Sequence, residues 1–308
     1  MSNKYSTSAS ITNNDSKVTT GNATTPSDEV GDGWSEWVGR TTSSTAVLDP
    51  AQANRLAVTL DREPTFAAGD PLPPAWHWLY FHELVPASDL GADGHPRLGI
   101  TMPPSTLTRR MWAAGRIDYD DRLELGQTVT RTSTIRSVAP KDGRSGALLF
   151  VTIDHVLRVG DRAMIREEQT VVYREPSAPT GGVSPPASHD ADFSDVWQLD
   201  SAALFRYSAL TFNAHRIHYD ADYARGTENY PGLVIHGPLL VTLLLDAARR
   251  RDLDLAHIRY RAVSPVFLPD AVTVSGRRRD DEVTLWATSA TGHLAMDATA
   301  TPRQETAR

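Results

Sequence analysis

The 308-residue chain contains no cysteine. Disulfide bonds, thiolate metal ligands and a cysteine nucleophile are therefore excluded, and a reducing compartment is its simplest setting. Positive charge is also scarce, since 31 lysine and arginine residues stand against 38 aspartate and glutamate residues and the formal net charge is −7. Binding to nucleic acid or to an anionic membrane needs a basic face. We therefore expect neither partner, and any anionic ligand must be held by individual arginines.

Long apolar runs are missing as well. The run from Leu239 to Leu245 contains Thr242 and ends at Asp246, so it is too short to span a bilayer. Residues 1–33 are rich in Ser, Thr, Asn and Gly and lack the apolar stretch of a secretory signal peptide. We expect them to form a disordered leader, and we expect the protein to be cytoplasmic.

The segment PSAPTGGVSPPASH, from Pro176 to His189, predicts a linker because Pro, Gly and Ser dominate it. The chain is long enough for two domains. We place an N-terminal domain at residues 34–175, the linker at 176–195 and a C-terminal domain at 196–304. Stretches rich in β-branched residues, separated by Asp/Gly turns, predict antiparallel strands on both sides. They are residues 127–138, 147–159 and 163–173, then 271–276, 283–289 and 294–301.

One helix is expected in the second half, from about Pro238 to Arg251. Its residues are almost all apolar, so other structure must surround it, whereas the arginines at its end should form a solvated C-terminus. A buried helix followed by antiparallel strands predicts a sheet curled around a helix. A weak repeat, LELGQTV from Leu123 and VFLPDAV from Val266, indicates that this unit occurs twice. The predicted fold is α+β, a double hot-dog of two antiparallel sheets, each wrapped around a central helix.

Two motifs in the second half carry candidate chemistry. TFNAHRIHYD contains His215 and His218, and LVIHGPLL places Gly237 at the expected start of the helix. A histidine with a pKa near neutrality can take up a proton and return it. Gly237 offers an unobstructed backbone N–H where the helix dipole favours developing negative charge. Together the motifs predict an acid/base group and an oxyanion site for a carbonyl that becomes an enolate.

These motifs, within Tyr207 to Ala224 and Tyr230 to Leu240, resemble the catalytic segment of MaoC-like hydratases and dehydratases. The resemblance is nearest to the type 2 hydroxyacyl-thioester dehydratases. In the first half, PLPPAWHWLYF, RRMWAAGR and EEQTVVYRE resemble the non-catalytic half of bacterial mesaconyl-C4-CoA hydratases. The resemblance implies a hydro-lyase that adds water to an enoyl-CoA thioester, or removes it, and it points most narrowly to conversion of mesaconyl-C4-CoA to citramalyl-CoA.

The resemblance also assigns residues. His218 matches the catalytic histidine and Gly237 the oxyanion glycine, whereas Asn213 stands where the usual motif has aspartate and His215 where it has asparagine. An amide can orient water but cannot ionise, so the usual Asp/His mechanism does not carry over. We expect no cofactor and no metal, because His215 and His218, with Asp220 or His236 as a further ligand, would make only a weakly specified metal site.

Further contacts to the acyl-CoA thioester are expected from three residues near the motifs, namely Tyr207, Arg216 and His236. His236 could equally be a packed histidine, and Arg216 could equally be solvated. A second carboxylate on the substrate would call for an arginine, and the candidates by residue type are Arg109, Arg110 and Arg116.

Two other functions stay open. A dehydratase of longer 3-hydroxyacyl thioesters, from fatty-acid or polyketide metabolism, would have an open apolar tunnel and no buried arginine. A non-catalytic or thioesterase-like acyl-CoA binding protein is favoured by the loss of aspartate at Asn213 and opposed by His218 with the His-Gly-Pro motif. The sequence also allows a homodimer.

Overall fold

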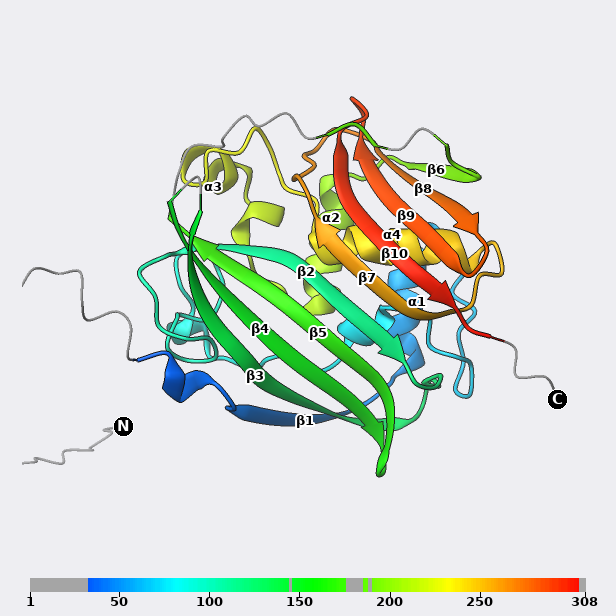
Figure 1. The fold of residues 1–308 in the computed structure, drawn as a ribbon, viewed down its shortest axis with the longest axis horizontal. Helices are drawn as coiled ribbons and strands as arrows, with labels where there is room; N and C mark the ends of the chain where they lie inside the picture. Colours follow the sequence, from blue (N-terminus) through cyan, green and yellow to red (C-terminus); the bar gives the residue numbers. More distant parts are fainter. Residues whose placement is uncertain (1–32, 144–145, 176–184, 188–189, 305–308) are drawn as a thin grey trace, which may run out of the picture. The chain divides into compact units, whose positions relative to one another are not determined.

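The computed structural model describes residues 33–143, 146–175, 185–187 and 190–304. The predicted leader, apart from Gly33, and much of the predicted linker lie outside these residues. Within them, the ten named strands form one antiparallel sheet in the order β1-β3-β4-β5-β2-β7-β10-β9-β8-β6 (Figure 1). The strands of the first half are β1 (Thr41–Val47), β2 (Arg109–Tyr119), β3 (Thr128–Gly143), β4 (Gly146–Val159) and β5 (Arg162–Arg174). Those of the second half are β6 (Phe193–Trp197), β7 (Leu255–Ala262), β8 (Val272–Arg279), β9 (Glu282–Ser289) and β10 (Leu294–Pro302).

The six predicted strand segments are confirmed as β3, β4, β5, β8, β9 and β10. The predicted domain boundaries stay a prediction, although β6 begins at Phe193, inside the range expected for the linker. It pairs with β8 from Phe193↔Gly276 to Trp197↔Val272. The second half of the sheet therefore starts earlier in the chain than the Pro/Gly/Ser composition indicates.

The two predicted sheets are joined into one, because β2 pairs with β7 from Ala114↔Arg261 to Asp118↔His257. Each of these two strands hydrogen-bonds to backbone N–H and C=O groups of the other that would otherwise be exposed at a sheet edge. Gly115 allows this close approach, since a Cβ atom there would lie 2.2 Å from the hydroxyl oxygen of Tyr260. The α+β double hot-dog class is correct, but its sheets form one continuous surface.

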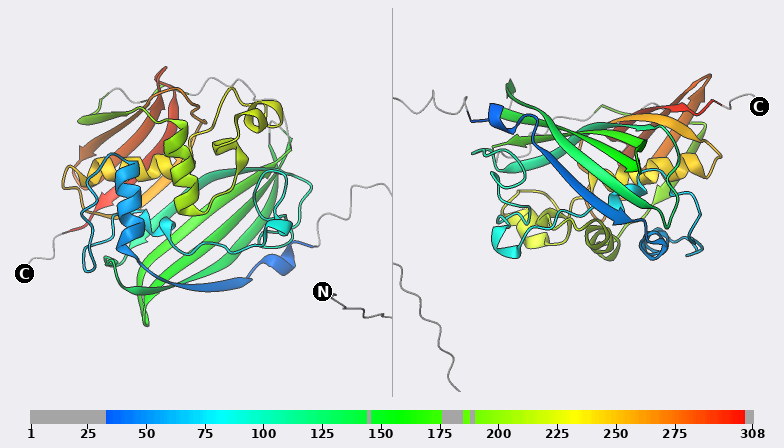
Figure 2. Two further views of the ribbon diagram at one scale, coloured as in Figure 1. Left: turned by 180° about the vertical axis from the view of Figure 1, so that it is seen from behind. Right: turned by 90° about the horizontal axis from the view of Figure 1, so that it is seen from below.

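The helices are α1 (Pro50–Thr59), α2 (Ser201–Thr211), α3 (Ala221–Gly226) and α4 (Gly237–Arg249). They lie on one face of the sheet, and the second half of the sheet curls around α4 (Figures 1 and 2). Helix α4 is the predicted apolar helix, with ten of its thirteen residues buried. Aspartates cap the three other helices: the carboxylates of Asp49, Asp200 and Asp220 accept from the backbone N–H groups of Ala51, Ala203 and Tyr223.

The expectation of a central helix in each half is wrong for the first half. Between α1 and β2, the described residues contain only the 3-10 turns η2 (Trp76–Leu79) and η3 (Ala87–Asp89). Frequent prolines in this connection, including Pro71, Pro73 and Pro74, prevent a long helix because each lacks the N–H that a helix interior needs. The first half instead leaves room on this face of the sheet, and the candidate site occupies it.

Candidate active site

A cavity of about 1560 Å³ is lined by residues from both halves of the chain. From the second half, His218 and Gly237 reach it. The first half supplies His95, Arg110 and Trp112. The three residues predicted as catalytic, His218, Asn213 and Gly237, therefore all line one cavity, and strand β2 supplies part of its wall.

His218 is held as a neutral imidazole. It ends the 3-10 turn η4 (Arg216–His218), and its Nδ1 lies 2.7 Å from the backbone oxygen of Val234. A carbonyl oxygen can only accept, so Nδ1 carries the proton and Nε2 of the neutral ring has a free lone pair. Burial lowers the pKa of His218 to about 4, although the hydrogen bond to Val234 opposes this shift. At neutral pH the imidazole is uncharged and able to accept a proton.

His236 lies behind His218 and does not line the cavity. The two rings stack with centroids 3.7 Å apart and planes 18° apart. His236 is completely buried, and its Nε2 lies 2.8 Å from the hydroxyl oxygen of Ser208. Burial lowers the pKa of His236, and the neighbouring histidines add to this effect. His236 is therefore placed to hold the ring of His218, and its side chain is not placed to contact an acyl-CoA in the cavity.

Gly237 is the first residue of α4, followed by Pro238. The N–H groups of the first helical turn have no acceptor within the helix, so they are available to a ligand at this end. A Cβ atom at Gly237 would lie only 2.8 Å from Cε3 of Trp112. Glycine is therefore required where the indole of β2 packs over the start of the helix. The cavity meets the helix N-terminus at this point, as an oxyanion site requires.

Asn213 shapes the loop that carries the histidines. Its side-chain oxygen accepts a hydrogen bond of 3.0 Å from the backbone N–H of His215, and its own N–H donates to the oxygen of Ser208. The amide oxygen is thus engaged by the loop, and the NH2 group is left to act as a donor at the cavity wall. His215 itself is buried, its Nε2 has no partner within the described residues, and burial lowers its pKa.

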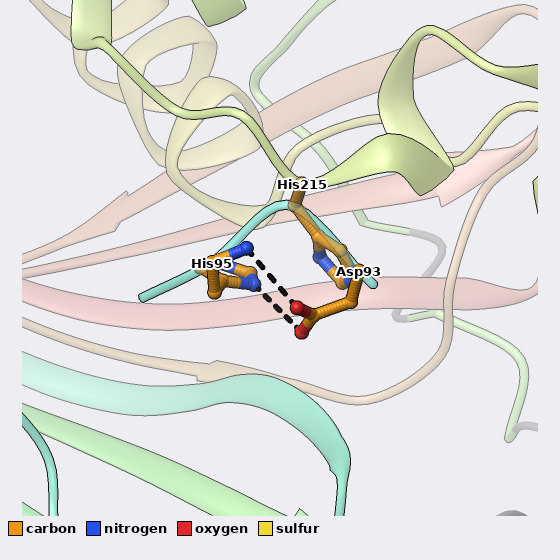
Figure 3. Close-up of side chains that lie close together, drawn as sticks. All are labelled: Asp93, His95 and His215. Carbon is orange, nitrogen blue, oxygen red and sulfur yellow. Dashed lines mark hydrogen bonds and ion pairs between the residues drawn. The ribbon is translucent and has the colours of Figure 1, made fainter. Parts of the chain in front are cut away.

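Asp93 and His95 join the site from the first half, and the sequence motifs do not reveal them (Figure 3). Their side chains hydrogen-bond to each other at 3.2 Å, and the His95 and His215 rings are 4.4 Å apart. Gly94 adopts a φ of +90°, and a Cβ there would clash with the oxygen of Ala214. The sequence signal that could have found this loop is Asp-Gly-His, a turn with a histidine after it.

Ligand atoms of Asp93, His95 and His215 lie within 4.8 Å of one another, so this group could in principle hold a metal ion. Two observations oppose this. The Asp93 carboxylate is already hydrogen-bonded to His95, and the positive charge of Arg110 acts on all three residues, lowering their pKa values. A nearby cation disfavours a second one, so we keep the prediction of no metal.

Tyr207 and Arg216 are placed differently from each other. Tyr207 is buried and reaches the cavity wall, where its ring lies edge-on to His236 at 5.0 Å, so it supports the stacked histidines. Arg216 does not reach the cavity. It is paired with Asp220 at 2.7 Å and lies over the ring of Tyr223. The structure therefore does not support the expected substrate contact of Arg216.

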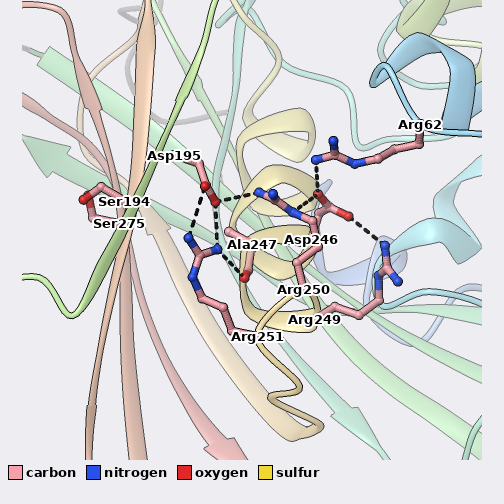
Figure 4. A network of polar contacts seen from close by, with 9 residues as sticks. All are labelled: Arg62, Ser194, Asp195, Asp246, Ala247, Arg249, Arg250, Arg251 and Ser275. Carbon is pink, nitrogen blue, oxygen red and sulfur yellow. Dashed lines mark hydrogen bonds and ion pairs between the residues drawn. The ribbon is translucent and has the colours of Figure 1, made fainter.

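The arginines at the far end of α4 are not simply solvated, which corrects the prediction from sequence. They bind two aspartates (Figure 4). Asp246, with a side chain only 1% exposed, lies within 3.1 Å of Arg62, Arg249 and Arg250. Asp195 on β6 binds Arg250 and Arg251. This network fastens α4 to its surroundings and takes no part in the cavity.

A double hot-dog fold with a neutral buried histidine and a helix N-terminus in one cavity defines a class: hydro-lyases that act on acyl thioesters. Residues 75–268 match the model of the family described as hydroxyacyl-thioester dehydratase type 2. The chain is 42% identical over 272 residues to the mesaconyl-C(4)-CoA hydratase of Chloroflexus aurantiacus, which covers 86% of this chain and 96% of that protein. The chain therefore belongs to the hydroxyacyl-thioester dehydratase type 2 family, and it is a hydro-lyase.

Other relatives agree. The mitochondrial hydroxyacyl-thioester dehydratase type 2 of Schizosaccharomyces pombe is 31% identical over 224 residues, covering 64% of this chain and 75% of that protein. Among solved structures, HtdX of Mycobacterium tuberculosis matches with a TM-score of 0.63 at 18% identity, covering 86% of this chain and all of that one. A second M. tuberculosis protein, described as having a double hotdog fold, matches with a TM-score of 0.52 at 14% identity over 87% of this chain and 96% of that one. These structures confirm the fold.

Proposed function

We propose that the protein hydrates mesaconyl-C4-CoA to citramalyl-CoA. The observation that carries the proposal is that the unprotonated Nε2 of His218 and the N-terminus of α4 at Gly237 belong to the same cavity. The relative with 42% identity along nearly its whole length is named for this substrate, which supports the choice among enoyl-CoA thioesters.

The reaction follows from these groups. Nε2 of His218 takes a proton from water, and the resulting hydroxide oxygen forms a bond to the β-carbon as the C=C π bond breaks. The electron pair moves to the thioester oxygen, where the Gly237 N–H and the dipole of α4 stabilise the enolate. The imidazolium then returns its proton to the α-carbon. Because one imidazole accepts and returns the proton, both additions occur on the same face.

Asn213 completes the proposed site. Since its side-chain oxygen is bound by the backbone of His215, its NH2 group is the end that can donate to the attacking water or to the substrate. A buried imidazolium is costly, and so the low pKa of His218 favours rapid return of the proton to the α-carbon. The stacked His236 keeps the ring of His218 in one orientation throughout this cycle.

The experiment is hydration by the purified protein, followed by loss of enoyl absorbance and by the mass of the product, with mesaconyl-C4-CoA and crotonyl-CoA as substrates. We expect His218→Gln to lower kcat by about 10²- to 10⁴-fold, because it removes the acid/base group. His257→Gln is the matched control, since His257 is on β7, outside the cavity. Equal activity of the two variants, both folded, would overturn the role of His218.

A dehydratase of longer 3-hydroxyacyl thioesters is the second candidate, and the volume of the cavity favours it, since about 1560 Å³ exceeds what a five-carbon acyl group fills. Turnover of a long 3-hydroxyacyl-CoA with no turnover of mesaconyl-C4-CoA would select this function. Release of free thiol without a hydrated product would indicate a thioesterase instead.

A cytoplasmic location and a homodimer also stay predictions. None of the described helices is long and apolar enough to cross a membrane. Light scattering of the purified protein tests the oligomeric state, since a dimer would have twice the 33.7 kDa mass of the chain.

A further inference from the structure

The cavity contains more arginine than the hydration of an uncharged enoyl group needs. Those that line it are Arg40, Arg110, Arg131 and Arg174. Arginine is favoured wherever a carboxylate or phosphate must be bound in two-point geometry. The contacts that each arginine makes indicate which arginine is available to an acyl group near His218.

Two of the four are already held. Arg40 donates to the backbone oxygen of Glu36 and stacks on Trp37, whereas Arg131 donates to the oxygen of Phe81 and lies over its ring. Arg174, on β5, has a buried Nε without a hydrogen-bond partner among the described residues, but its charge is not among those that lower the pKa values of His95, His215 and His218. Among the arginines that line the cavity, Arg110 is the one whose charge acts on His95 and His215.

Arg110 differs in its position. It is two residues before Trp112 on β2, and side chains two apart on a strand point to the same face. Trp112 packs over Gly237, so Arg110 projects into the same side of the cavity within about 7 Å along the strand. Arg110 is half-buried and has no hydrogen bond or ion pair with the described residues, although its charge acts on Asp93, His95 and His215.

The other two arginines that the sequence offers for this role are engaged elsewhere. Arg109 points away from Arg110 on the strand and binds Glu228 at 2.7 Å, where it is buried. Arg116 pairs with Asp118 at 3.2 Å in a half-exposed position. Of the three candidates, Arg110 alone lines the cavity.

Resting on the proposed function, we propose that Arg110 binds the free carboxylate of the acyl group and so selects dicarboxylic enoyl thioesters. In mesaconyl-C4-CoA the carboxylate is attached to the β-carbon, the atom that water attacks. It must therefore lie close to the base, and the His215 ring, on which the charge of Arg110 acts, is 5.5 Å from that of His218. In this arrangement the thioester oxygen would meet Gly237, which Trp112 contacts in the same cavity.

A charged partner favours binding of the carboxylate because apolar side chains make up much of the cavity wall and Arg110 is half-buried. A carboxylate removed from water without one is strongly disfavoured, whereas a charge-assisted pair with a guanidinium recovers this cost. The same Arg110 disfavours an acyl group that has only carbon at this position, since it would leave the guanidinium without an acceptor. Selection thus acts both for the carboxylate and against its apolar analogue.

The test compares mesaconyl-C4-CoA with 3-methylcrotonyl-CoA, in which a methyl group replaces the carboxylate. Wild type, Arg110→Met, Arg110→Lys and the surface control Arg116→Met are assayed for kcat/KM on both substrates. For Arg110→Met we expect the ratio of kcat/KM values, mesaconyl-C4-CoA over 3-methylcrotonyl-CoA, to fall roughly 10- to 150-fold, as for loss of a hydrogen bond to a charged group. Arg110→Lys should restore part of this ratio because it keeps the charge.

The outcomes show whether the role of Arg110 fails alone or together with the proposed function. If Arg110→Met lowers kcat/KM for both substrates equally, Arg110 does not bind the carboxylate, and the proposed hydration still stands. If the wild type hydrates 3-methylcrotonyl-CoA but not mesaconyl-C4-CoA, both the substrate and the role of Arg110 are wrong. A melting curve for each variant shows whether the fold is kept; if Arg110→Met does not fold, the ratio measured with Arg110→Lys decides, and an unchanged ratio there overturns the inference.

Discussion

Lowering the pH tests the buried state of His218 in two independent ways. The ring is 7% exposed, its Nδ1 is fixed by Val234, and its pKa is about 4 instead of 6.5. A histidine in solution would be about 90% protonated at pH 5.5, whereas one with a pKa near 4 would be about 97% neutral. We therefore expect kcat/KM to hold from pH 7 to about pH 5.5 and to fall only as the pH nears 4.

The same pKa predicts a loss of stability in acid. Because the folded pKa is lower than the unfolded one, the unfolded chain binds more protons between pH 6.5 and 4, and the free energy of unfolding decreases as the pH falls through this range. A pKa difference of about 2.5 corresponds to about 3 kcal/mol from His218 alone. His215 and His236, whose pKa values are also lowered by burial, act in the same direction.

The assay is a pH–rate profile with crotonyl-CoA beside urea unfolding curves at each pH. In His218→Gln the decrease in unfolding free energy between pH 6.5 and 4 should be smaller by about 3 kcal/mol, since glutamine does not titrate there. His257→Gln, at a partly exposed position, provides the comparison. An acidic limb with an apparent pKa of 6 to 7 in protein that is still folded would refute the burial argument, and so would equal acid sensitivity of His218→Gln and wild type.

Two further predictions concern α4. Gly237→Ala should lower kcat/KM by about 100-fold, because the new Cβ would lie 2.8 Å from the ring of Trp112 and disturb the oxyanion site. The control is Gly226→Ala, since nothing lies within 4 Å of a Cβ atom there. Unchanged kinetics of Gly237→Ala with an unchanged melting curve would remove Gly237 from the mechanism. Asp246→Ala should lower the free energy of unfolding by about 1–2 kcal/mol, measured in urea, since it removes the buried carboxylate that three partly exposed arginines bind. Asp297→Ala is the matched surface control, and a similar small effect of both would mean that the network adds no stability.

The sequence predicts best what depends on local pattern. The alternation of β-branched residues identified β3, β4 and β5, and the apolar run identified α4 to within two residues at its end. Helix α2 was not predicted, because the apolar residues from Ser201 to Thr211 have only a weak helical periodicity. The missing helix of the first half was also not predicted, since a weak repeat does not show which elements a second copy has lost.

The site was predictable only where it is contiguous in sequence. His218, Gly237 and Asn213 lie on neighbouring segments of one half, so motif spacing was enough to bring them together. Asp93 and His95 contact this segment through the turn at Gly94, more than 100 residues earlier in the chain, and no local pattern encodes such a contact. The partners of a charged side chain are also not evident from the sequence, and only the structure shows that Asp220 and Tyr223 hold Arg216.

The first half therefore does more than cover the cavity. Its strand β2 brings Trp112 against Gly237, and its turn at Gly94 packs on the loop that carries His215. Asn213 cannot ionise, so the usual carboxylate partner of the histidine is absent from the second half, and its amide serves the loop through the N–H of His215 instead. In the proposed mechanism the second half supplies the proton-transfer group, His218, and the first half supplies Arg110, the proposed partner of the substrate carboxylate. Both Arg110 and the Trp112 that packs against Gly237 belong to β2, the strand that pairs with β7, so the proposed mechanism depends on this junction between the two halves.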